Sequence, residues 1–175
     1  MLRQVRKHRH SQRDRVIILL SIKAGLRAGE IANLTWPMVL DPKGRIGPVI
    51  ELYDWAAKQC SGRSIPVHPD LRKALIKLRR TGDGQGPVIL SERGRAMRPT
   101  SIVNWFASLY RRLGLDGCSS HSGRRTFITN AARNVHRAGG SIRDVQQLAG
   151  HRSIHMTQRY IEGDTAAKRR LVALL

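Results

Sequence analysis

The sequence predicts an α+β domain that is mainly helical and carries one small antiparallel sheet. Apolar residues recur at helical spacing along most of the chain, whereas residues 42–68 alternate strand-like runs with prolines and glycines. No internal repeat or low-complexity tract appears. A chain of 175 residues, 41% of them hydrophobic, is long enough to bury a core without disulfides or a metal.

The first two helices are expected between residues 11 and 34. Ser11 is the predicted N-cap of a helix whose apolar residues lie in Val16–Ile22, and Gly25 is its predicted stop. Ala28–Leu34 has the pattern of a second, short helix. The prolines and glycines of residues 37–48 then break any helix.

The small sheet is expected next. Val49–Tyr53 and Ser64–Val67 have the composition of strands, and the turn region Trp55–Gly62 joins them. Pro69 then opens a helix, because proline suits the first helical turn.

The second half of the chain is predicted to be helical after a short strand at Pro87–Leu90. Ser141 and Asp144 have the spacing of a capping box, which marks one of the helix starts. The expected helices cover residues 99–113, 121–136, 142–148, 153–161 and 166–175.

The charge is the most unusual property of the composition. The net charge is +20, and such an excess of Lys and Arg indicates a polyanionic partner. DNA, RNA and an anionic membrane surface all fit, and so does a ribosomal or nucleoid-like protein that coats nucleic acid without chemistry. Residues 1–10 are expected to form a basic arm, either disordered along a phosphate backbone or a solvated leader.

The sequence gives no sign of a membrane or secreted protein. The basic start lacks the apolar stretch of a signal peptide, and Val16–Ile22 is too short to cross a bilayer. Cys60 and Cys118 belong to no CxxC pair, so free thiols in a reducing cytoplasm are expected. Without a cluster of carboxylates, we expect neither a metal nor another cofactor, and we expect a cytoplasmic, nucleoid-associated protein.

Three ordered blocks suggest the chemistry. They are a Gly-Leu-Arg-x-x-Glu pattern at residues 25–30, His-x-x-Arg before Thr-Phe at 121–127, and Leu-x-Gly-His with a later Thr and Tyr at 148–160. Together they resemble the tyrosine recombinases, also called phage integrases. The resemblance spans nearly the whole chain from about Ser11 and implies a tyrosine-recombinase-like catalytic domain over residues 11–175. It implies that the catalytic residues are Arg27, His121, Arg124, His151 and Tyr160.

The resemblance also implies a role for each of these residues. Arg27 and Arg124 would each donate paired hydrogen bonds to nonbridging phosphate oxygens, and His151 would donate another. Tyr160 would attack phosphorus, with His121 as the candidate base. The family's lysine lies on a turn before an Arg-x-Val-Pro pattern, so Lys58, ahead of Arg63-Ser-Ile-Pro, is the candidate general acid, although Gly-Lys-Gly is absent.

Other charged residues are expected around this site. Glu30 lies one helical turn beyond Arg27 and is expected to have a structural role as a buttress. Further arginines are expected to contact DNA phosphates, a solvated basic face being the alternative for each; they are Arg63, Arg93, Arg95, Arg98 and Arg125.

The implied function is site-specific DNA recombination through a 3′-phosphotyrosyl intermediate, for integration, excision or inversion, as in phages and other mobile elements. The implied partner is double-stranded DNA with specific target sites, bound by a homotetramer whose subunits are monomers when free. The family's N-terminal core-binding domain is expected to be absent, either because the chain is a fragment or because it is a naturally short member of the family. Type IB topoisomerase-like relaxation and a decayed DNA-binding regulator remain the alternatives.

Overall fold

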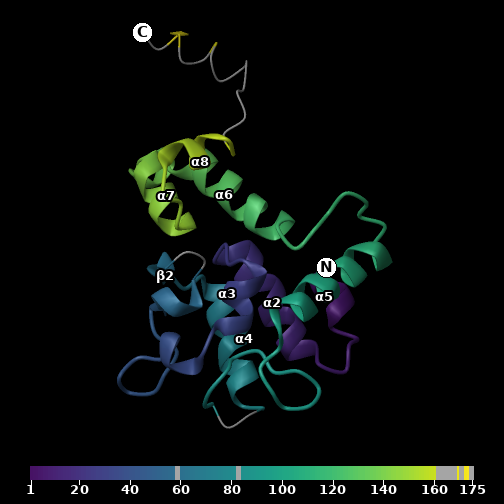
Figure 1. The fold of residues 1–175 in the computed structure, drawn as a ribbon. Coiled ribbons are helices and arrows are strands. Elements are labelled where there is room, and N and C mark those ends of the chain that lie inside the picture. Colours follow the sequence, from purple (N-terminus) through teal and green to yellow (C-terminus); the bar gives the residue numbers. More distant parts are fainter. Residues whose placement is uncertain (58–59, 82–83, 161–168, 170–171, 174–175) are drawn as a thin grey trace.

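The computed structural model describes residues 1–57, 60–81, 84–160, 169 and 172–173 (Figure 1). It is mainly helical with a two-stranded antiparallel sheet, which confirms the predicted fold class. The helices are α1 (Leu2–Val5), α2 (Ser11–Lys23), α3 (Ala28–Asn33), α4 (Pro69–Arg79), α5 (Pro99–Arg112), α6 (Ser122–Asn134), α7 (Ile142–Ala149) and α8 (Ile154–Gln158), with short 3-10 turns η1 (Trp36–Met38), η2 (Asp54–Ala56) and η4 (His136–Ala138).

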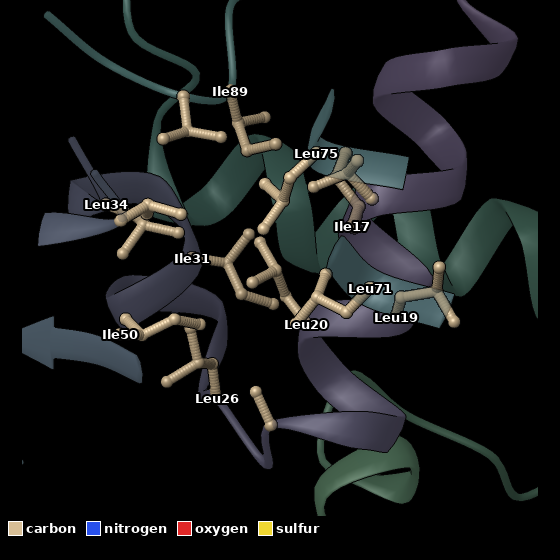
Figure 2. Close-up of a cluster of buried hydrophobic side chains, with 14 of the residues drawn as sticks. Ile17, Leu19, Leu20, Leu26, Ile31, Leu34, Ile50, Leu71, Leu75 and Ile89 are labelled. Carbon is tan, nitrogen blue, oxygen red and sulfur yellow. The ribbon is translucent and has the colours of Figure 1, made fainter. Parts of the chain in front are cut away.

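The hydrophobic core has two main parts. The larger cluster runs from Val16 to Tyr110 and packs α2, α3, α4 and α5 with one face of the sheet. Figure 2 shows its centre, where Leu20, Ile31 and Leu71 come from three different helices. A smaller cluster joins α6 to α7. In Figure 1, α6, α7 and α8 form a group at one end of the molecule, after the long connection from α5.

The sheet pairs β1 (Val49–Leu52) with β2 (Arg63–Pro66), close to the predicted strands. Ile50 lies opposite Ile65, and both side chains are fully buried in the larger cluster. This register leaves Arg63 opposite Leu52 at the start of β2. The sheet therefore holds the start of β2 beside α7, one of the helices around the candidate site.

The N-terminal segment differs from the expected disordered arm. Residues 2–5 form α1, and Val5 is buried against Ile18 and Leu109. The predicted Ser11 cap is also wrong, because α2 begins at Ser11 itself and His10 is the N-cap residue. The burial of the apolar Val5 side chain thus helps to hold this segment in place despite the repulsion among its basic residues.

Three further expectations have mixed outcomes. The capping box of Ser141 and Asp144 is confirmed at the start of α7. Pro87–Leu90 is not a strand, since Pro87 and Leu90 form only isolated bridges, to Thr35 and Ala96 respectively. The helix predicted over residues 166–175 lies almost entirely outside the described residues.

The surface of the described chain adds two findings. Cys60 and Cys118 are free and exposed. None of the helices in the described ranges is both long enough and apolar enough to span a bilayer.

The turn between α2 and α3 depends on a glycine. Gly25 has φ +66°, a conformation that L side chains rarely adopt, and the amide of Leu26 donates to the carbonyl of Leu20 at 3.0 Å. A Cβ atom at Gly25 would lie 2.4 Å from Cδ1 of Phe127, in α6. The turn therefore requires glycine for both its backbone conformation and its contact with α6.

We expect Gly25→Ala to lower the free energy of unfolding by about 2–5 kcal/mol, from left-handed strain plus overpacking against Phe127. Gly29→Ala is the matched control, because a Cβ atom at Gly29 in α3 meets nothing within 4 Å. That variant should be neutral or about 0.5–1 kcal/mol more stable. Urea unfolding of both variants tests the pair, and equal stabilities would contradict the proposed constraint.

Candidate active site

Arg27 is the N-cap residue of α3, where the Gly25 turn delivers the chain. Its Nη1 atom donates to Oε1 of Glu30 at 2.7 Å, and its backbone amide donates to Oε2 at 2.9 Å. The Glu30 side chain is only 1% exposed. Glu30 therefore buttresses Arg27, as the spacing of the two residues suggested.

Arg63 reaches the same carboxylate from β2. Its Nη1 and Nη2 atoms donate to the two Glu30 oxygens at 3.1 and 3.0 Å, and its Nε donates to the carbonyl of Leu148 at 3.0 Å. Its side chain is 6% exposed. The expectation of a DNA contact is therefore wrong for Arg63 in this structure, because its guanidinium is buried and bound within the protein.

The Glu30 carboxylate is held in its charged form. Burial acts to raise its pKa, but the hydrogen bonds and positive charges of Arg63 and Arg27 outweigh burial and lower the pKa to about 2. At neutral pH this carboxylate is therefore an anion between two arginines.

Arg124, in the first turn of α6, is buried and joins two distant segments. Its Nη1 atom donates to the carbonyl of Gly25 at 2.6 Å, and its Nη2 atom donates to the carbonyl of Ala149. Burial, followed by the charges of Arg27 and Arg63, lowers its pKa to about 10, against the opposing effect of Glu30 and Tyr160. Arg124 consequently keeps its positive charge at neutral pH.

His151 follows the C-cap of α7 and is 7% exposed. Its Nδ1 atom lies 3.0 Å from Oγ1 of Thr157, and its backbone carbonyl accepts from the Gln146 side chain at 2.9 Å. Burial, then the charges of Arg124, Arg27 and Arg63, lower its pKa to about 4. His151 is therefore a neutral imidazole near pH 7.

Tyr160 lies beside His151. The two rings stack with centroids 5.6 Å apart and planes 23° apart. The Tyr160 ring also packs against the smaller hydrophobic cluster, and its backbone amide donates to the carbonyl of Thr157 at 3.0 Å. Packing and stacking thus hold the phenol in the group of α6, α7 and α8.

His121 lies on another side of the site. It is the N-cap residue of α6, and its side chain is exposed and makes no capping hydrogen bond. Together with Arg27, Glu30 and Ala57 it lines a cavity of about 460 Å³. The cavity is large enough to admit a substrate group between Arg27 and His121.

The structure thus gathers Arg27, Arg124, His151 and Tyr160 through charge interactions and ring stacking, and His121 lines the same cavity as Arg27. Lys58 lies outside the described residues. The remaining arginines expected at DNA have exposed side chains, which leaves that prediction open; they are Arg93, Arg95, Arg98 and Arg125. In the described part of the chain, no three His, Cys, Asp or Glu side chains gather closely enough for a metal site.

Sequence reasoning missed two residues that support the site. The buried pairing of Arg63 with Glu30 joins residues 33 positions apart, and no local pattern signals it. Thr157 has a better signal, because it is the threonine between His151 and Tyr160 in the third block. Its contact with His151 was nevertheless not anticipated.

Comparison with known proteins agrees with this arrangement. The model of the phage integrase family matches residues 1–166. The chain belongs to the phage integrase family. A phage integrase relative from Myxococcus xanthus, tyrosine recombinase XerC, is 31% identical over 161 residues, which cover 86% of this chain and 50% of the relative. The XerC of Brucella suis biovar 1 is 28% identical over 159 residues, which cover 87% of this chain and 47% of the relative.

Solved structures of an integrase and a recombinase have the same fold. The Tn1549 transposon integrase in complex with a circular intermediate DNA gives a TM-score of 0.78 at 20% identity, over 99% of this chain and 62% of that one. The XerA recombinase gives a TM-score of 0.73 at 25% identity, over 99% of this chain and 59% of that one. The chain spans about half the length of the curated relatives it matches.

The buried neutral His151 predicts a pH dependence of stability in this phage integrase domain. The imidazole titrates near pH 6.5 when unfolded and near 4 when folded, so between these values the unfolded chain binds more protons. The free energy of unfolding should therefore fall as the pH drops from 7 to 5, with a His151 contribution of at most about 2 kcal/mol.

Chemical denaturation at both pH values measures this contribution. His151→Gln should show a smaller loss than the wild type, because glutamine does not titrate. His136→Gln, which removes an exposed imidazole in η4, is the control and should retain the wild-type loss. Parallel losses in the wild type and His151→Gln would argue against a buried neutral imidazole.

Proposed function

We propose that this chain is the catalytic domain of a site-specific DNA recombinase that cleaves and rejoins strands through a phosphotyrosyl bond to Tyr160. Membership of the phage integrase family supports this proposal, and so do relatives that carry the name tyrosine recombinase. Solved neighbours are integrases and recombinases bound to DNA. The names of the relatives favour recombination over topoisomerase-like relaxation or a decayed regulator.

The observation that carries the proposal is a phenol beside a buried arginine that is positively charged at neutral pH. Arg124 is buried and fixed by two backbone carbonyls, and its charge interacts with the half-buried Tyr160 phenol. A phosphodiester resists attack because its anionic oxygens repel nucleophiles, so neutralising them stabilises the transition state. Arginines suit this task, since they stay charged and bind phosphate oxygens in pairs.

The proposed step is a displacement at phosphorus. The Tyr160 oxygen forms a bond to phosphorus, its proton passes to His121, and the bond to the 5′ oxygen breaks. The leaving oxygen takes a proton from Lys58, giving a 3′-phosphotyrosyl link and a free 5′ hydroxyl. Attack by a 5′ hydroxyl on the link reverses the step, so rejoining needs no external energy source.

The wider proposal concerns the assembly. We propose that the domain acts on double-stranded DNA at specific target sites as a homotetramer, and in the cytoplasm on nucleoid DNA. The net charge of +20 and the exposed Arg93, Arg95, Arg98 and Arg125 supply positive charge for phosphate contacts. The affinity should consequently fall steeply with salt concentration.

We expect Tyr160→Phe to abolish a covalent protein–DNA adduct while leaving DNA binding unchanged, because only the phenolic oxygen is lost. The substrate is a pool of nicked duplexes with randomised cores, and a denaturing gel detects the adduct. Tyr53→Phe and Tyr110→Phe complete the set of three tyrosines and should still form it. An adduct that survives in Tyr160→Phe would reject Tyr160 as the nucleophile.

The substrate for the next test is a duplex that forms the covalent adduct, recovered from the randomised pool. We expect Lys58→Ala to slow its cleavage by roughly 10²–10⁴-fold, the usual contribution of a general acid. A 5′-phosphorothiolate substrate should restore most of the rate, because sulfur leaves without a proton. Single-turnover cleavage of both substrates measures the effect. Equal defects on the two substrates would assign Lys58 another role.

A further inference from the structure

The Thr157 hydroxyl lies in the interior beside His151. Thr157 is fully buried in α8, and its Oγ1 atom lies 3.0 Å from Nδ1 of His151. This is its one hydrogen bond among the side-chain contacts of the described residues. The chemical question is which of the two groups donates.

A buried hydroxyl hydrogen without an acceptor costs free energy, so such groups are almost always paired. The hydroxyls of Thr126 and Thr81 donate to helix carbonyls, those of Ser122 and Leu78, at 3.0 and 2.7 Å. Thr157 has no such carbonyl partner within the described chain, and Nδ1 of His151 is the acceptor in reach. The need to pair the hydroxyl therefore favours Thr157 as the donor, with Nδ1 as an acceptor that bears no hydrogen.

The remaining contacts fix the ring around this hydrogen bond. The backbone amide of His151 donates to the carbonyl of Gln146 at 3.1 Å, and the Gln146 side chain donates to the His151 carbonyl. One face of the imidazole stacks on Tyr160. With Nδ1 engaged by Thr157, the single polar atom left on the ring is Nε2.

We propose that Thr157 is a positioning residue that holds His151 in the tautomer with hydrogen on Nε2, ready to donate to a nonbridging phosphate oxygen. The phosphate acceptor rests on the proposed function, whereas the tautomer rests on the hydrogen bond alone. A neutral imidazole with hydrogen on Nδ1 would instead present a lone pair to the phosphate and repel it. The depressed pKa of His151 means that protonation cannot supply the second hydrogen near pH 7.

Nitrogen-15 NMR of the ring at pH 7 tests the tautomer without DNA, with His151→Gln identifying the resonances. The wild type and Thr157→Ser, which keeps the hydroxyl, should show hydrogen on Nε2. Thr157→Val, which has nearly the same shape and lacks the hydroxyl, should show a mixture of tautomers. Hydrogen on Nδ1 in the wild type, or an unchanged spectrum in Thr157→Val, would overturn the proposal.

Cleavage kinetics test the consequence. Thr157→Val should slow single-turnover cleavage roughly three- to tenfold, the effect of one ordinary hydrogen bond, and Thr157→Ser should restore the rate. In a His151→Gln background, Thr157→Val should have no further effect, because Thr157 acts through His151. Additive losses would overturn the positioning role. Thr81→Val is the matched control. It makes the same change of side chain and removes a hydroxyl that donates to the Leu78 carbonyl, and its cleavage rate should equal that of the wild type.

The two experiments separate this proposal from the proposed function. If the wild type cleaves no DNA, the NMR result still decides the tautomer. If DNA is cleaved but the tautomer lies on Nδ1, the proposed function stands and the role of Thr157 falls.

Discussion

The buried guanidinium of Arg124 is the interaction on which the rest of the site depends. It joins the carbonyl of Gly25, at the turn between α2 and α3, to the carbonyl of Ala149, at the end of α7. The first segment delivers Arg27 and the second delivers His151. One side chain therefore sets the spacing between parts of the site that lie more than 100 residues apart in sequence.

Three arginines in one interior require a compensating anion. Glu30 supplies it, bound to Arg63 by two hydrogen bonds and to Arg27 by one side-chain bond. Unpaired buried charges are costly, whereas a charge with several hydrogen bonds is tolerated. Because Arg124 bonds to carbonyls and not to a carboxylate, its charge is the one least neutralised by the protein itself. An anionic substrate is the natural counter-charge.

The sequence predicted the helical order, the sheet and the capping box at Ser141, because each has a local signal: periodicity, turn residues or fixed spacing. The spacing of Arg27 and Glu30 likewise predicted their contact. The errors arise where contacts between residues far apart in sequence decide which side chains are buried. Charge does not reveal burial, so Arg63 was assigned to DNA. Val5 packs against Ile18 and against Leu109, which lies more than 100 residues further along the chain.

The division of the hydrophobic core has a consequence for unwanted DNA cleavage. The cluster joining α6 to α7 has few fully buried residues, and such small units open at lower free energy than a large core. Because His151 and Tyr160 both lie in this part, its opening would withdraw the proposed nucleophile and its neighbour together while the larger cluster stayed folded. A partly opened molecule would then still present basic surface to DNA but would be unable to break a strand.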